Sequence, residues 1–86
     1  MDTMHFNYFV DPGHGWVEAD RLLLKLLGIT DRISAYSYQN RDKVYLEEDC
    51  DADVLVEALK AKGITIKLDR IYQEVTPIRD YAGYEA

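Results

Sequence analysis

The sequence has few of the features on which exported and membrane proteins depend. Its single cysteine, Cys50, excludes an internal disulfide, as expected of a protein in a reducing cytosol. No stretch approaches the roughly 18 consecutive apolar residues of a membrane-spanning helix, and the N-terminus lacks the basic start and apolar run of a signal peptide. We therefore expect a cytoplasmic protein with no membrane partner.

Basic residues are also scarce. Ten Lys and Arg stand against sixteen Asp and Glu, which gives a net charge of -6. Because affinity for nucleic acid comes largely from Lys and Arg that neutralise phosphates, this balance argues against direct nucleic-acid binding and favours a protein with a basic surface. The whole excess lies in residues 47–59, which hold six carboxylates and no basic residue.

The chain is short enough for one α+β domain with one core. Apolar periodicity, turn residues and helix-ending glycines predict its elements. In chain order they are a strand over 4–10, a turn over 11–15, a helix over 18–27 ended by Gly28, two hairpin strands over 35–39 and 43–47, a helix capped by Asp51 or Asp53 and ended by Gly63, and a strand over 64–69 that can continue to Tyr72.

This order of elements is βαββαβ, the split βαβ pattern of ferredoxin-like folds. It predicts a four-stranded antiparallel sheet with two helices on one face. We expect residues 1–76 to form the domain. Residues 77–86 are expected to form a tail that docks through Ile78, Tyr81 and Tyr84.

A calcium loop is the nearest match to a metal motif. Asp49, Asp51 and Asp53 fit its D-x-D-x-D opening. Val54 stands where the loop needs glycine, and Lys60 stands where it needs a bidentate glutamate. We therefore favour a strand end that leads into a capped helix, with weak divalent binding left open.

Other chemical motifs fail on spacing or charge. His5, His14 and Cys50 lack the short spacings of a zinc site, and the acidic surroundings of Cys50 disfavour the thiolate that a nucleophile needs. The glycine-rich turn over 11–15 lacks the glycine spacing and the lysine of a phosphate-binding loop. We expect no cofactor, no metal and no catalytic residue, and therefore no enzyme.

Tyr36, Tyr38 and Tyr45 lie on the predicted hairpin. On the open face of a ferredoxin-like sheet such side chains can stack on RNA bases. Glu47 and Glu48 follow directly and oppose that reading. Packing in the core, in a homodimer or against a protein partner is the favoured interpretation.

Three stretches, His14-Gly15-Trp16, Tyr36-Ser37-Tyr38 and residues 45–51, resemble a pattern in small uncharacterised proteins encoded by bacteriophages and prophages. The resemblance implies a non-enzymatic protein that binds and modulates or inhibits a host protein in the bacterial cytoplasm, for example an anti-defence protein whose acidic patch blocks a basic groove. The candidate contact residues are Tyr36, Tyr38, Tyr45, Glu47, Glu48, Asp49, Asp51 and Asp53.

Three alternatives remain. The acidic block can serve solubility alone, since a net charge of this size is common in small soluble domains. The protein can be a self-associating structural or regulatory module whose open sheet faces pair through Tyr36, Tyr38 and Tyr45. It can also be a regulatory domain that binds a metal or a nucleotide.

Overall fold

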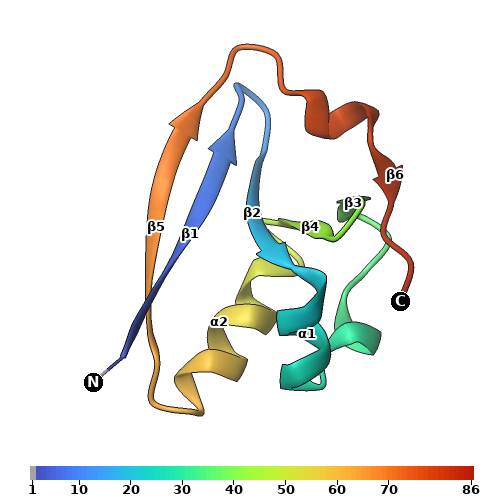
Figure 1. The fold of residues 1–86 in the computed structure, drawn as a ribbon. Helices are drawn as coiled ribbons and strands as arrows, with labels where there is room; N and C mark the ends of the chain where they lie inside the picture. Colours follow the sequence, from blue (N-terminus) through green and yellow to red (C-terminus); the bar gives the residue numbers. More distant parts are fainter. Residues whose placement is uncertain (1) are drawn as a thin grey trace.

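In the computed structural model, which describes residues 2–86, two helices pack on one mixed six-stranded sheet of order β5-β1-β2-β4-β3-β6 (Figure 1). The elements are β1 (Thr3–Val10), β2 (Gly15–Asp20), α1 (Arg21–Leu27), η1 (Thr30–Arg32), β3 (Tyr38–Asn40), β4 (Lys43–Glu47), α2 (Ala52–Lys60), β5 (Thr65–Tyr72), η2 (Pro77–Asp80) and β6 (Ala82–Gly83). The predicted α+β class is confirmed. The predicted four-stranded antiparallel ferredoxin-like sheet is wrong in strand number and direction.

The first difference is β2, which occupies the start of the predicted first helix. Residues Gly15–Asp20 pair with β1 on one side and with β4 on the other. Val17 and Ala19 face the helices, while Trp16 packs in a separate cluster with Tyr45, so the segment alternates as a strand does. The helix therefore begins only at Arg21, and it ends as predicted at Gly28, whose φ is +70°.

The second difference is the direction of β5. The extra strand β2 adds one reversal of chain direction that the βαββαβ pattern does not have. As a result β5 runs parallel to β1, in register from Thr3 with Thr65 to Val10 with Tyr72. The hairpin strand β4 and the extension of the last strand to Tyr72 agree with the prediction. The other hairpin strand, predicted over 35–39, is shorter and lies later, at Tyr38–Asn40, and residues 35–37 form a turn and a bend.

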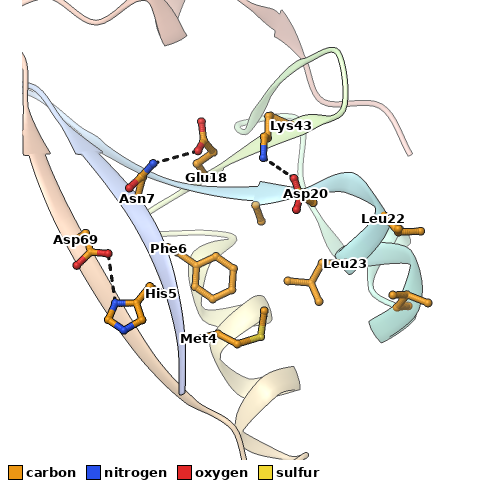
Figure 2. A pocket seen from close by; sticks show the side chains of 12 residues that line it. Met4, His5, Phe6, Asn7, Glu18, Asp20, Leu22, Leu23, Lys43 and Asp69 are labelled. Carbon is orange, nitrogen blue, oxygen red and sulfur yellow. Dashed lines mark hydrogen bonds and ion pairs between the residues drawn. The ribbon is translucent and has the colours of Figure 1, made fainter. Parts of the chain in front are cut away.

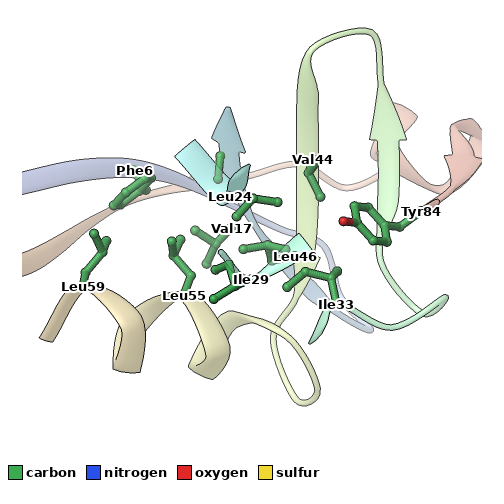
Figure 3. Packing of buried hydrophobic residues seen from close by; sticks show 11 residues of the cluster. Phe6, Val17, Leu24, Ile29, Ile33, Val44, Leu46, Leu55, Leu59 and Tyr84 are labelled. Carbon is green, nitrogen blue, oxygen red and sulfur yellow. The ribbon is translucent and has the colours of Figure 1, made fainter. Parts of the chain in front are cut away.

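Both helices contribute to one core on one face of the sheet (Figure 3). Leu24 of α1 and Leu55 and Leu59 of α2 are almost fully buried there. The buried members of this cluster are Phe6, Val17, Ala19, Leu24, Ile29, Ile33, Val44, Leu46, Leu55, Leu59 and Tyr84. No helix in residues 2–86 has the length and apolar character needed to cross a membrane.

The C-terminal residues cover part of the opposite face. Ile78 of η2 is buried against Trp16 and Tyr45, and Tyr81 packs at the edge of the same cluster. Tyr84 joins the main core and donates a hydrogen bond from its hydroxyl to the Thr30 carbonyl at 2.6 Å. The predicted docking through Ile78, Tyr81 and Tyr84 is confirmed, and β6 adds a strand beside β3.

Candidate functional site

A hollow of about 230 Å³ lies beside Trp16 and is called the Trp16 pocket below. It brings together the turn before β2, the segment before β3, the end of β4 and the C-terminal η2. Its lining residues are His14, Trp16, Tyr36, Tyr38, Glu47, Asp49, Cys50 and Arg79.

Asp11 holds one side of this pocket in place. Its buried carboxylate accepts the backbone amides of Gly13 and His14, both at 2.9 Å. It also accepts two bonds from Arg79, from Nε at 2.6 Å and from Nη2 at 2.9 Å. The Arg79 guanidinium, followed by these amides, keeps the pKa of Asp11 far below its usual range. The charge of Arg79 is therefore already compensated, and its guanidinium lies over the Trp16 ring at 5.3 Å.

Glu47 holds the other side. Its side chain is only 8% exposed, and Oε2 accepts the backbone amides of Asp49 and Cys50 at 3.0 and 2.8 Å. Its own amide donates to Ser37 Oγ at 2.9 Å. The turn after β4 is thus wrapped around a fixed carboxylate. A hydrogen bond to Glu47 raises the pKa of the Cys50 thiol, which keeps this sulfur protonated and a poor nucleophile.

The remaining lining residues make the pocket aromatic and negative. Trp16 and Tyr38 meet edge to face at 6.2 Å, and the His14 ring lies 6.0 Å from that of Trp16. Tyr36 is 73% exposed and forms the outer wall. With Arg79 paired to Asp11, the carboxylates of Glu47 and Asp49 leave a net negative charge. Trp16 is only 2% exposed, so the tyrosines that offer surface to a ligand are Tyr36 and Tyr38. Aromatic faces beside carboxylates are suited to an ammonium or guanidinium group.

A possible metal-binding group borders this pocket. His14, Glu47 and Glu48 each place one ligand atom within 4.8 Å of those of the other two, so a divalent cation could bridge them. Glu48 accepts a 2.5 Å hydrogen bond from the Tyr8 hydroxyl, which raises the pKa of Tyr8 to about 12. The zinc set of His5, His14 and Cys50 that the sequence failed to support does not form, because His5 lies on β1 beside Asp69.

Four of the eight predicted contact residues, Tyr36, Tyr38, Glu47 and Asp49, line the Trp16 pocket, and Glu48 borders it. Asp53 is exposed in the first turn of α2 and does not line it.

The sequence left Tyr45 between packing in the core and contact with a partner, and the structure places it in the core. Tyr45 is buried against Phe9 and Tyr81, and its hydroxyl donates to Glu18 at 3.0 Å. Burial, together with this bond, raises its pKa well above the usual value for tyrosine. A strand residue that faces a covered side of the sheet cannot meet a partner directly.

Asp51 is the second predicted contact residue that the structure buries. It is only 2% exposed and accepts the Ser34 amide at 3.0 Å, the Ser34 hydroxyl at 2.7 Å and the Ser37 hydroxyl at 2.5 Å. It occupies the N-cap position of α2, yet its side chain caps no helix amide. The carboxylate instead ties the segment before β3 to the start of the helix.

Sequence reasoning missed Trp16, His14, Cys50 and Arg79 as pocket residues. His14 lies within the glycine-rich turn over 11–15 and Trp16 follows it directly, and the sequence showed no phosphate-binding pattern in this turn. Arg79 lies 68 positions from its partner Asp11, and no local pattern connects them.

A second hollow of about 420 Å³ opens where β1 and β2 diverge beside α1 (Figure 2). Its floor is apolar, with Met4, Phe6 and Leu23. The polar groups on its rim already pair with one another: Asn7 with Glu18 at 3.3 Å, Lys43 with Asp20 at 2.5 Å, and His5 with Asp69 at 3.4 Å. This hollow therefore offers less uncompensated charge than the Trp16 pocket.

Comparisons with protein-family models, with curated proteins and with solved structures give no match to this chain. The resemblance to phage-encoded proteins therefore stays a prediction, and the geometry of the Trp16 pocket carries the functional argument.

Proposed function

We propose that this chain is a protein-binding module that takes a basic side chain of its partner into the Trp16 pocket. The observation that carries the proposal is the combination of aromatic walls with two carboxylates whose charge no basic residue of the pocket offsets. The chain acts by binding, without catalysis.

Preorganisation supports this function. Glu47 is held by two backbone amides, and Trp16 lies under the guanidinium of Arg79, so neither side chain loses much freedom when a ligand enters. Tyr36 is the mobile exception, because it is largely exposed. Tyrosine and tryptophan are the residues that most often dominate the energy of protein interfaces, since they bury large area at low entropic cost.

The resemblance to phage-encoded proteins indicates the kind of partner. We propose a host protein with a basic, nucleic-acid-binding surface, whose activity is modulated or inhibited when an Arg or Lys of that surface enters the pocket. An anti-defence role is one form of this proposal.

Short peptides test the pocket without knowledge of the partner. The probes are glycine and serine peptides that carry one arginine, one lysine or, as the neutral control, one norleucine. The readout is the indole N–H resonance of Trp16, the single tryptophan of the chain. We expect the arginine and lysine peptides to shift this resonance at millimolar concentration. Equal shifts with the norleucine peptide would overturn the proposal.

Matched variants make the test specific. Asp49→Lys and Tyr36→Ala alter exposed residues of the pocket and should abolish the shift. Asp53→Lys changes charge equally in the same acidic block but outside the pocket, and should leave the shift intact. If Asp53→Lys weakens binding as much as Asp49→Lys, general charge explains the binding and the pocket does not.

Capture from a bacterial lysate then tests the partner. Immobilised wild-type protein should retain a basic protein that Asp49→Lys does not retain, with Asp53→Lys as the positive control. A protein that self-associates without any such partner would instead support the alternative of a structural or regulatory module.

A further inference from the structure

The strand β5 is an open edge of the sheet. It is the outermost strand of the sheet order, and Figure 1 shows it at the margin of the molecule beyond β1. Its eight residues contain neither proline nor glycine, and its register with β1 is unbroken. Natural proteins limit pairing at open edges with proline, bulges, short strands or charged side chains. Of these, β5 has only charged side chains, those of Lys67, Asp69 and Arg70.

The backbone hydrogen bonds between β5 and β1 show which backbone groups of β5 face outward. The amides of Thr65 and Gln73 donate to the carbonyls of Asp2 and Val10, so the odd-numbered residues point toward β1. Because N–H and C=O groups alternate sides along a strand, those of Ile66, Leu68 and Arg70 point away from the sheet. These outward groups are the ones that a further strand would bond.

The charged side chains of β5 indicate which strand would pair with this edge. Lys67 and Asp69 flank Leu68 and lie on the same face of the strand. We propose that two copies of this chain associate through antiparallel pairing of their β5 strands about a two-fold axis at Leu68. In this register Lys67 of each copy lies opposite Asp69 of the other, which gives two symmetric cross-strand ion pairs. Asp69 contacts His5 Nδ1 through Oδ2 at 3.4 Å, so its carboxylate would be shared between His5 and the Lys67 of the other copy.

The two nearest registers are disfavoured by like charges. A shift by two residues in one direction places Lys67 opposite Lys67, and a shift in the other direction places Asp69 opposite Asp69. The central register also places Leu68, which is 42% exposed, against its own copy. Pairing of one edge buries less than the roughly 1,200 Å² of a standard interface, so a weak, concentration-dependent dimer is expected.

This dimer is separate from the proposed function. The strands β1 and β2 lie between β5 and β4, at whose end Glu47 contributes to the Trp16 pocket. It is also distinct from the pairing of tyrosine-bearing sheet faces that the sequence suggested. Loss of peptide binding and loss of dimerisation therefore report on different surfaces.

Sedimentation equilibrium with charge-swap variants tests the pairing. Lys67→Glu or Asp69→Lys alone creates two like-charge pairs across the axis and should weaken the dimer about tenfold or more. The double variant K67E/D69K restores opposite charges and should recover the wild-type affinity. Lys25→Glu, an exposed charge reversal on α1, is the control and should have no effect. A monomer at millimolar concentration, or a double variant as weak as the single variants, would overturn the proposal.

Amide hydrogen exchange on the wild type gives a second test that needs no variant. The outward amides of Leu68 and Arg70 should gain protection as concentration rises, while the inward amides of Lys67 and Asp69 should stay constant. Protection that rises at Tyr36 and Tyr38 instead would identify the tyrosine face as the contact and refute pairing through β5.

Discussion

Replacement of Asp51 by alanine distinguishes a structural residue from a contact residue. The sequence suggests that Asp51 belongs to an acidic contact surface, whereas the structure buries it among three donors from Ser34 and Ser37. Ser37 also accepts the amide of Glu47, so the same network reaches the Trp16 pocket. We therefore expect Asp51→Ala to act first on stability, with loss of peptide binding as a consequence.

The expected loss of unfolding free energy follows from the hydrogen-bond donors that lose their acceptor. Hydrogen bonds to a charged acceptor contribute about 1.5–3 kcal/mol each, and three of them would sum to roughly 5–9 kcal/mol. The sum overstates the cost, because Ser34 is only half buried and can bond to water after the change. Ser37 is fully buried and cannot. We expect a loss of about 3–5 kcal/mol, comparable to breaking one buried ion pair.

Thermal and urea unfolding measure this loss, with far-ultraviolet circular dichroism and Trp16 fluorescence as independent probes. In a domain of this size about 1 kcal/mol shifts Tm by roughly 4–8 °C, so Asp51→Ala should lower Tm by at least about 12 °C. Asp53→Ala, an exposed residue of the same helix turn, should cost no more than about 1 kcal/mol. Equal stability of the two variants would refute the buried network.

Three smaller changes test other parts of the structure. Gly15→Ala places a Cβ 2.6 Å from the Tyr8 hydroxyl and should lower the free energy of unfolding by about 1–3 kcal/mol. Displacement of this hydroxyl from Glu48 should also lower the Tyr8 pKa from about 12 toward 10, and an unchanged tyrosine titration by NMR would contradict this. Arg41→Gly relieves a φ of +57° and should raise stability to urea by about 1 kcal/mol, whereas a decrease would show that the Arg41 side chain matters more than the strain. The pKa of Asp11 is lowered in the folded protein, so its pairing with Arg79 stabilises the fold above pH 3.8, the ordinary pKa of the group, and this stabilisation is lost as pH falls toward the folded pKa. Asp11→Asn should therefore reduce the loss of unfolding free energy with falling pH below 3.8. A loss as steep as that of the wild type would argue against the pairing.

Features set by neighbours in the chain were predicted well. Gly28 ends α1 because a glycine is needed at positive φ, and the turn between β3 and β4 lies where the polar residues mark it. The start of α1 was misplaced because Ala19, Leu22 and Leu23 fit a helical spacing as well as Val17 and Ala19 fit an alternating one. Only pairing with β1 and with β4 decides between the two, and β4 is distant from this segment in the sequence.

The same limit applies to the site. Tyr36, Tyr38 and Asp49 are local surface signals, and the structure brings them together in one pocket. The pairing of Asp11 with Arg79 depends on the C-terminal segment folding back over the sheet, which a segment without clear periodicity does not reveal. The direction of β5 depends in turn on the unforeseen β2. One misplaced element therefore altered both the number of strands in the sheet and the direction of the last one.

The acidic block also has a different meaning in three dimensions. Asp51 faces serines, Glu47 faces backbone amides, and Glu48 accepts the Tyr8 hydroxyl, so half of its carboxylates have bonding partners within the fold. A protein that bound through summed charge would expose these groups to solvent. Here the carboxylates of Glu47 and Asp49 instead meet aromatic walls at one place, and Asp49 is the exposed one. Affinity for a basic partner should therefore depend on the position of the charge more than on its amount, which is why Asp49→Lys and Asp53→Lys, equal in charge, are expected to differ in binding.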